Sequence, residues 1–276
     1  MLLSLPFYLL ILLYSRRNQP KKIEPVYYAW AIGMGLLGYY MSSLFDFIGL
    51  QYVSAGIERI ILFIYPTLAV LINYLIFKVA ISKRQWLAIC ITYLGIGIAY
   101  WGEFTHLPDT AKFVFGSIMV LLCGITYAFY LVGTGKLVPI MGSIQYTSIA
   151  MIAASAGIIT HYLVASTLND GFVQAFSFQL SQSVIWYIVG LAIIATVIPS
   201  FLLSMGMNRI GSNDLAIVAS IGPVSTLFQA NLILGEPMLW QQLLGTGFVI
   251  AGVLLVQKVG VARTSSNHPS YPSPKG

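Results

Sequence analysis

The sequence predicts an all-α fold, a polytopic bundle of membrane-spanning helices with an inverted internal repeat. Three observations lead to this prediction. Of the 276 residues, 58% are hydrophobic and 8% are charged, whereas a soluble domain carries about 25% charged residues. The apolar runs are long and unbroken, while a membrane β-barrel would show short alternating segments. Two apolar stretches with a central proline, Ser54–Phe77 and Gly211–Leu234, also share one layout.

The two proline-containing stretches are related by a constant offset. Pro66 and Pro223 are 157 residues apart (223 minus 66). The same offset aligns three further pairs without a gap, which are Gly49 with Gly206, Gln85 with Gln242, and Gly95 with Gly252. Weak internal symmetry of this kind is typical of transporters. Because the two stretches are the third and the eighth predicted spans, we expect them to cross the membrane in opposite directions.

Nine apolar runs are predicted to span the membrane, since about 20 apolar residues cross the hydrocarbon of a bilayer. The first is short and contains Pro6. The predicted spans are Met1–Tyr14, Val26–Leu50, Ser54–Phe77, Gln85–Trp101, Phe113–Leu137, Ile144–Leu168, Val184–Met207, Gly211–Leu234 and Gln241–Lys258. We expect a first repeat over residues 1–101 and a second over 113–258. The tail 259–276 is rich in serine and proline and is predicted to be disordered.

Lysine and arginine are distributed unequally between the two sets of connecting loops. One set, which includes Arg16, Lys78, Arg84 and the C-terminal tail, carries nearly all of them, and the other carries Lys112. Cytoplasmic loops of membrane proteins have an excess of Lys and Arg. The C-terminus is therefore predicted to be cytoplasmic and the N-terminus to face outward.

Several kinds of site are not expected. The net charge of +6 comes from basic residues scattered between apolar runs, which does not favour nucleic-acid binding. Cys90 and Cys123 lie inside apolar runs, and the three histidines are far apart, so neither a metal site nor a disulfide is predicted. The sequence contains no HExxH motif, no His-box and no pair of acidic residues, so it predicts no catalytic residues. It also contains no GxxxxGK[ST] motif, so we do not expect this chain to use ATP as an energy source. We expect no enzyme activity and no cofactor.

Candidate residues for a substrate pathway are polar, aromatic or proline residues inside the apolar spans. They are Tyr65, Pro66, Asn73, Tyr127, Tyr130, His161, Pro223, Gln229 and Asn231. A proline frees a carbonyl and bends a membrane helix, so the two matched prolines either serve packing or open a midplane cavity. The polar groups either bond between helices or line the pathway. His161 could also titrate and serve proton coupling.

Three charged residues lie near the connection between the second and third predicted spans. A helical hairpin would bring Asp46 and Arg59 to similar depth, and Arg in a membrane should find a partner. Glu58 is adjacent to Arg59, but neighbours on a helix point about 100° apart, so Glu58 is predicted to be the poorer partner. An Asp46–Arg59 pair could fix the hairpin or act as a gate, and an unpaired Arg59 could instead extend to water.

The chain resembles the EamA family of the drug/metabolite transporter superfamily. The resemblance rests on SSLFDFIGLQYVSAGIERIILFIYPTLAVL at Ser42–Leu71, which is similar to that family's short helix, small-residue turn and helix with a central proline. The pattern recurs at Gly206–Gly252, including the turn Gly235–Pro237 and a glycine-rich last helix. GITYAFYLVGTGK at Gly124–Lys136 is similar to the opening helix of the family's second repeat.

The resemblance implies a secondary transporter, a permease or exporter, that moves a small metabolite across a bacterial inner membrane by alternating access. Proton coupling and a homodimer are left open. The family pattern has ten helices, and this chain lacks the first; a natural truncation, a misassigned start codon or a nine-span variant would each explain this. The family often has an acidic residue after the fourth helix of a repeat. Glu236 occupies this position in the second half of the chain, and Val79 occupies it in the first half. The alternatives are a non-transporting assembly or receptor subunit, and a membrane-embedded enzyme.

Overall fold

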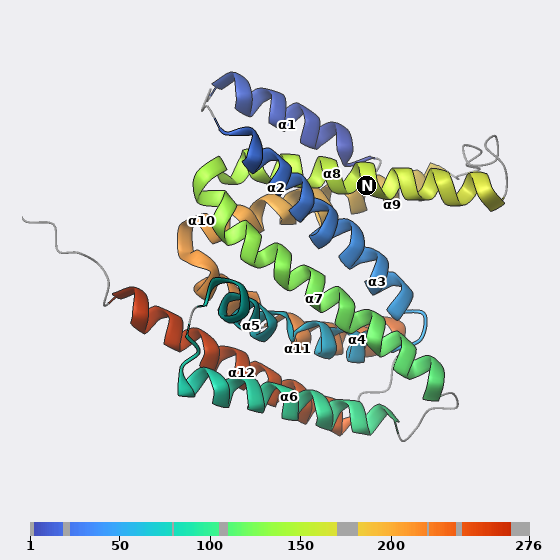
Figure 1. The fold of residues 1–276 in the computed structure, drawn as a ribbon. Helices are drawn as coiled ribbons and strands as arrows, with labels where there is room; N and C mark the ends of the chain where they lie inside the picture. Colours follow the sequence, from blue (N-terminus) through green and yellow to red (C-terminus); the bar gives the residue numbers. More distant parts are fainter. Residues whose placement is uncertain are drawn as a thin grey trace, which may run out of the picture. The chain divides into compact units, whose positions relative to one another are not determined.

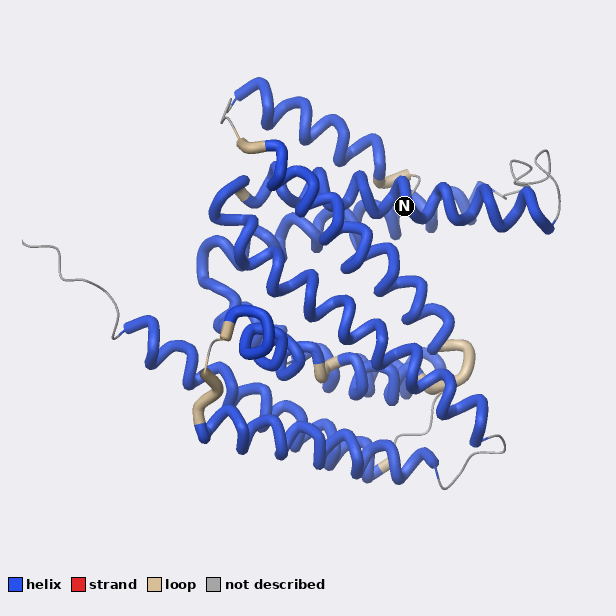
Figure 2. The backbone as a smooth tube through the Cα atoms, in the orientation of Figure 1, coloured by secondary structure: helices blue, strands red, loops and turns tan. Residues whose placement is uncertain are grey.

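The computed structural model describes residues 3–18, 23–78, 80–104, 110–169, 182–219, 221–235 and 239–265, and every regular element in these ranges is helical (Figures 1 and 2). This confirms the predicted all-α class. Labels with η mark π-helical segments. The elements are α1 (Leu5–Asn18), α2 (Pro25–Gly35), η1 (Leu36–Met41), α3 (Ser42–Gly49), α4 (Ala55–Leu62), α5 (Tyr65–Phe77), α6 (Lys83–Phe104), α7 (Thr110–Met141), α8 (Ser143–Asn169), α9 (Gln182–Ala192), η3 (Ile193–Val197), α10 (Ile198–Ala219), α11 (Ile221–Gln229), η4 (Ala230–Leu234) and α12 (Trp240–Ser265).

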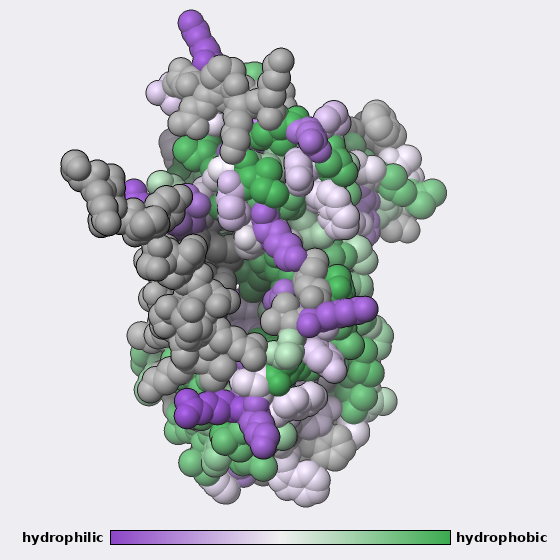
Figure 3. Space-filling model, turned by 60° about the vertical axis from the view of Figure 1, so that its left-hand side comes forward, coloured by the Kyte–Doolittle hydropathy of each residue, from purple (hydrophilic) through white to green (hydrophobic). Residues whose placement is uncertain are grey.

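Five of the described helical segments are long and apolar enough to cross a membrane. They are Pro25–Gly49, Ala55–Ile76, Thr110–Met141, Ser143–Leu168 and Val184–Gly206. Two shorter apolar helices, Leu5–Ser15 and Trp240–Leu255, overlap the first and last predicted spans. Large apolar side chains such as Leu75 and Leu232 are exposed, and Figure 3 shows few hydrophilic side chains between the apolar ones on the face it draws. The exact number of spans stays a prediction.

The chain forms two compact units, and each takes helices from both halves of the sequence. Unit 1 comprises Met1–Gln51 and Ile118–Gly211, and unit 2 comprises Tyr52–Ser117 and Ser212–Gly276. These units cut across the predicted repeats, whose boundaries stay a prediction. At the C-terminal end α12 continues to Ser265, beyond the predicted last span, and residues 266–276 of the tail lie outside the described ranges.

Unit 1 is built around α8, which packs against α1, α2 and η1. Glycine permits the closest of these approaches. A Cβ on Gly35 of α2 would overlap the backbone carbonyl of Ala150 on α8. Small residues let membrane helices approach to backbone contact, so this position explains how α2 and α8 come together.

Unit 2 is organised by the packing of α6 against α12, with α4 in contact with α6, α11 and α12. Gly95 of α6 and Gly245 of α12 face each other: a Cβ on Gly95 would lie 2.6 Å from the Gly245 carbonyl oxygen, and one on Gly245 would lie 2.5 Å from the Gly95 oxygen. Only glycine fits at both positions without moving a backbone.

The offset of 157 residues recurs in the ends of the helices. It relates the first residues of η1 and η3 (36 and 193), the last residues of α5 and η4 (77 and 234) and the first residues of α6 and α12 (83 and 240). The left-handed residues Lys78 (φ 53°) and Gly235 (φ 69°) are also 157 apart. The two halves therefore begin and end several helices at matched positions.

The matched glutamines perform the same local task. Gln85 Oε1 accepts a hydrogen bond from the Ser82 backbone N–H at 2.8 Å, and Gln242 Oε1 accepts one from the Leu239 N–H at 3.3 Å. In the first copy the Ser82 hydroxyl also accepts from the Gln85 N–H, which completes a capping box. These bonds satisfy donors that a helix start leaves free, and they explain why glutamine stands at both positions.

Candidate functional site

The core of unit 1 holds a group of five tyrosines, which we call the tyrosine cluster: Tyr8, Tyr39, Tyr127, Tyr130 and Tyr146. Tyr130 on α7 is fully buried. The rings of Tyr39, Tyr127 and Tyr146 have centroids 5.0, 5.7 and 6.5 Å from its ring, within the range in which aromatic rings attract. Tyr8 of α1 packs in the same region with Tyr39. Two of the predicted pathway residues, Tyr127 and Tyr130, thus come together.

The hydroxyl groups of the tyrosine cluster differ in their partners. The Tyr146 hydroxyl lies 2.7 Å from that of Thr134, and the Tyr8 hydroxyl lies 2.9 Å from that of Ser200. The buried Tyr130 hydroxyl lies near those of Tyr39 and Thr134, yet it makes no hydrogen bond of normal geometry within the described part of the chain. A buried hydroxyl without a partner costs about 1–3 kcal/mol. A ligand with a polar group would supply the missing partner.

Both π-helical segments that the structure describes in unit 1 border this cluster. Tyr39 belongs to η1, and Val197 of η3 packs in one core with Tyr8. The Tyr8 hydroxyl also donates to the backbone carbonyl of Thr196 in η3 at 3.3 Å. Pro199 accounts for η3, because it lacks the N–H that a regular α-helix needs there. Single π-helical turns inside α-helices are frequent at functional sites.

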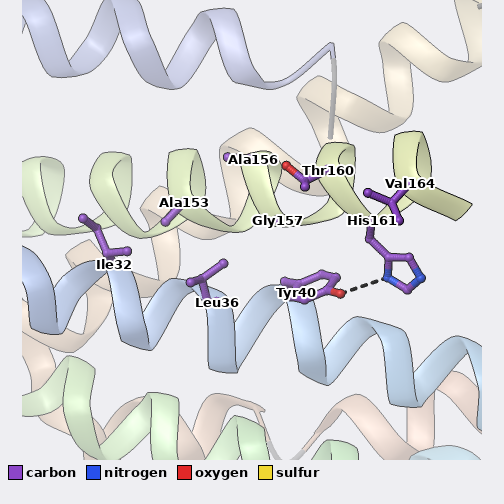
Figure 4. Close-up of a pocket in the computed structure, with 9 residues that line it drawn as sticks. All are labelled: Ile32, Leu36, Tyr40, Ala153, Ala156, Gly157, Thr160, His161 and Val164. Atoms are coloured by element: carbon purple, nitrogen blue, oxygen red, sulfur yellow. Dashed lines mark hydrogen bonds between the residues drawn. The ribbon is translucent and has the colours of Figure 1, made fainter. Parts of the chain in front are cut away.

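A groove with a volume of about 590 Å³ lies between α8 and the α2–η1 helix (Figure 4). Its α8 side is made of small residues, including Ala153 and Gly157. At one end the Tyr40 hydroxyl lies 2.9 Å from His161 Nδ1, and the two rings meet edge to face. His161 therefore has the interhelical partner expected of a polar group inside an apolar span. Its titration in proton coupling stays a prediction.

The first proline stretch, Ser54–Phe77, contains a break in the helix. The chain leaves helical geometry at Phe63 and Ile64, between α4 and α5, two residues before Pro66. Pro66 is buried and is the second residue of α5, so the break stands where the proline has no N–H to offer the preceding turn. The Thr67 hydroxyl donates to the Ile64 carbonyl at 2.8 Å, which satisfies one backbone acceptor at the break.

The second proline stretch is described on both sides of Ser220, which itself lies outside the described residues, and Pro223 belongs to α11. Whether the break before Pro66 and the matched Pro223 line a substrate cavity stays a proposal.

The ion pair in unit 2 corrects one expectation. Arg59 Nε lies 3.1 Å from Glu58 Oε2, and Glu58 is 1% exposed while Arg59 is 44% exposed. Glu58 is therefore the observed partner, although its position next to Arg59 argued against it. That argument compared the directions of Cβ atoms and neglected the length of an arginine side chain, which can fold back along the helix.

Asp46, the other predicted partner of Arg59, belongs to unit 1 and Arg59 to unit 2. Its Oδ1 atom is buried and accepts no hydrogen bond from a described residue. An Asp46–Arg59 pair therefore stays a prediction, and so does a role of the Asp46 carboxylate in a gate.

The remaining polar candidates bond mainly within their own helices. Asn73 Nδ2 donates to the Ala69 carbonyl at 3.0 Å, and Gln229 Nε2 donates to the Ser225 hydroxyl at 2.7 Å. Asn231 is exposed in η4. Tyr65 instead packs edge to face on Phe63 at the helix break. Neither of these two hydrogen bonds crosses to a neighbouring helix.

The sequence reasoning missed two contributors to the tyrosine cluster. Tyr8 lies in a short first run and Ser200 in a long apolar run, and their contact joins positions 192 apart in the chain. The sequence feature that points to Tyr8 and Ser200 is a hydroxyl group inside an apolar run. Among the described residues, no group of three or more His, Cys, Asp or Glu could hold a metal ion.

Comparison with known proteins identifies the family. The model of the EamA-like transporter family matches residues 1–101 and 114–257. The chain belongs to this family.

This EamA-like chain is similar to two transporters of Bacillus subtilis (strain 168). It is 31% identical over 255 residues to the "Uncharacterized transporter YcbK", which covers 91% of this chain and 80% of that protein. It is 24% identical over 222 residues to the "Uncharacterized transporter YdfC", which covers 80% of this chain and 68% of that protein.

The EamA-like chain also resembles a solved structure described as "Crystal structure of protein". The TM-score is 0.59 at 15% sequence identity, over 96% of this chain and 88% of that one. At this identity the likeness shows the fold alone, and it agrees with an all-helical bundle.

Proposed function

We propose that this EamA-like protein is a secondary transporter that moves a small metabolite by alternating access. Membership of a transporter family supports transport in general. The observation that carries the finer proposal is the helix break before Pro66, because Pro223 stands at the matched position of the second half at the same offset of 157 residues. Discontinuous helices from two repeats form the substrate sites of many secondary transporters.

The tyrosine cluster supports a substrate that carries polar uncharged groups beside an apolar or aromatic body. Tyr8, Tyr130 and Tyr146 are fully buried, and the cluster itself contains no charged side chain. Aromatic walls with a few polar groups are the usual lining of small-molecule sites. The Tyr130 hydroxyl is the group that we expect to bond the substrate.

Transport is tested by reconstituting the purified protein into proteoliposomes with a panel of labelled amino acids, sugars and nucleosides. We expect uptake of at least one class. Because hinge positions change turnover, Pro66→Ala and Pro223→Ala should each lower the initial rate about fivefold or more. Pro25→Ala is the matched control, since Pro25 stands at the start of α2, where proline has no bond to break.

Each outcome of the panel has a meaning. Uptake that a protonophore abolishes supports proton coupling, and uptake that it leaves intact favours another ion or the substrate's own gradient. Normal rates in both proline variants would remove the main support for the cavity. A folded protein that moves no member of the panel would favour a non-transporting subunit.

The sidedness of the protein gives a separate prediction. Basic residues flank Ser82, so the positive-inside rule places it in the cytoplasm and the start of α7 outside. In a background with Cys90→Ala and Cys123→Ser, we expect an impermeant maleimide to label Thr110→Cys in intact cells. Ser82→Cys should react only after permeabilisation, and labelling of Ser82→Cys in intact cells would contradict the predicted topology.

A further inference from the structure

A second pocket in unit 1, with a volume of about 680 Å³, differs in character from the tyrosine cluster. We call it the basic pocket. It is formed by the C-terminal part of α1, the turn between α7 and α8, and α10, and its polar lining includes Ser15, Ser143, Gln145, Asn208 and Arg209. Arg209 is the charged residue among those that line it, and no carboxylate does so. The pocket therefore favours an anion.

The first turn of α8 supplies backbone donors to the basic pocket. The N–H groups of Ser143, Ile144 and Gln145 have no acceptor among the described residues, as expected at an uncapped helix start. Gly142, the residue before the helix, has φ of +82° and no side chain that could cap it. The amide nitrogen of Gln145 points to a neighbouring helix, where it donates to the Tyr28 hydroxyl at 3.0 Å. A helix start of this kind attracts anions.

An independent observation comes from the Ser143 side chain. Ser143 lines the basic pocket and is only 8% exposed, and its hydroxyl makes no hydrogen bond to any described residue. Its oxygen is not among the fully buried atoms that lack a partner, so it keeps accessible surface and can be reached from the pocket. Because Ser143 lies beside the free N–H groups, a ligand oxygen in the pocket would supply a hydrogen-bond partner for its hydroxyl.

We propose that the basic pocket binds a phosphate group, held by the first turn of α8, the Ser143 hydroxyl and the Arg209 guanidinium. A phosphate presents several strong acceptor oxygens, and an arginine fork with oriented N–H groups matches them. The apolar part of the lining, with Ile11, Met141 and Met205, accommodates the rest of an amphiphilic molecule. Either a phospholipid headgroup or a water-soluble phosphate ester carries this chemistry, and basic pockets between membrane helices are known places for anionic headgroups.

The test uses the full-length protein, purified and delipidated in a neutral detergent. Binding is measured by native mass spectrometry for phosphatidylglycerol, for diacylglycerol, which lacks the phosphate, and for glycerol 3-phosphate against glycerol. We expect the phosphate-bearing member of at least one pair to bind about tenfold more tightly than its partner, since charge-assisted hydrogen bonds are the strong ones. A preference in the lipid pair alone identifies a headgroup, and one in the glycerol pair identifies a soluble ester.

The matched variants separate a built site from general electrostatic attraction. Arg209→Gln should weaken phosphate binding about tenfold or more, while Arg17→Gln, which removes the same charge from α1 outside the lining, should change it less than about twofold. If Arg209→Gln does not fold, Arg209→Lys and Ser143→Ala take its place, and each should still weaken binding severalfold. Equal losses in Arg209→Gln and Arg17→Gln, or no phosphate preference in either pair, would overturn the proposal.

Discussion

Gly245→Ala is expected to destabilise the protein, with a fall in melting temperature of about 5 °C or more. The added Cβ would lie 2.5 Å from the Gly95 carbonyl oxygen and 2.6 Å from the Ala99 Cβ. Neither neighbour is the end of a flexible side chain, so α6 and α12 would have to separate. Thermal unfolding of the purified protein, followed by the loss of monodisperse material after heating, measures the effect.

The control for this prediction lies two residues away on the same helix. Nothing stands within 4 Å of a Cβ on Gly247, and alanine is the better helix former. Gly247→Ala should therefore leave the melting temperature unchanged or raise it slightly. Gly95→Ala against Gly97→Ala repeats the comparison on α6, where again only the first position is crowded. Equal behaviour within each pair would mean that the two helices do not meet at this glycine contact.

Tyr130→Phe is expected to fold as well as the natural protein while losing transport. Its hydroxyl has no hydrogen bond of normal geometry to a described residue, so removing it should leave stability unchanged or raise it by up to about 1 kcal/mol. The loss of one hydrogen bond to the substrate should lower the transport rate about three- to tenfold. Proteoliposome uptake and thermal unfolding are compared on the same preparation.

Two further substitutions distinguish the hydroxyl from the ring. Tyr146→Phe breaks the 2.7 Å bond to Thr134 and should cost about 1 kcal/mol. Tyr130→Ala empties a fully buried site and should cost about 3–5 kcal/mol. If Tyr130→Phe transports at the natural rate, this hydroxyl does not contact substrate, and the cluster serves packing alone.

Much of the fold could be predicted because it depends on features that composition and spacing reveal. The unbroken apolar runs predicted helices, and four residue pairs at one offset predicted the repeat that the helix ends follow. The interruption before Pro66 follows from the missing N–H of proline, which is a local property. Gln85 and Gln242 were aligned by identity, and their shared capping role became visible only with the coordinates.

The site was less predictable because its contacts are not local. Tyr8 meets Ser200 and Tyr40 meets His161 across long stretches of chain, and no spacing rule connects them. The π-helical segment η1 has the sequence LLGYYM, which contains no proline from which the segment could have been predicted. Glu58 was predicted to be the poorer partner of Arg59, yet it forms an ion pair with it, because the length of the arginine side chain outweighs the direction of its Cβ atom. The basic pocket escaped notice because it depends on a turn at Gly142 and on Arg209 meeting it from another helix.

The contact between α6 and α12 has a consequence for the origin of the chain. The offset of 157 maps Gly95 onto Gly252 and Ala88 onto Gly245. A Cβ on Gly95 would meet the Gly245 carbonyl oxygen, and a Cβ on Gly252 would lie 2.7 Å from the Ala88 carbonyl oxygen, so the two contacts are the same contact seen from either helix. Such self-complementarity is the mark of a twofold interface. A half-length ancestor with one such helix would already have possessed both sides of this contact, so the fusion of two gene copies would have required no new packing surface between these helices.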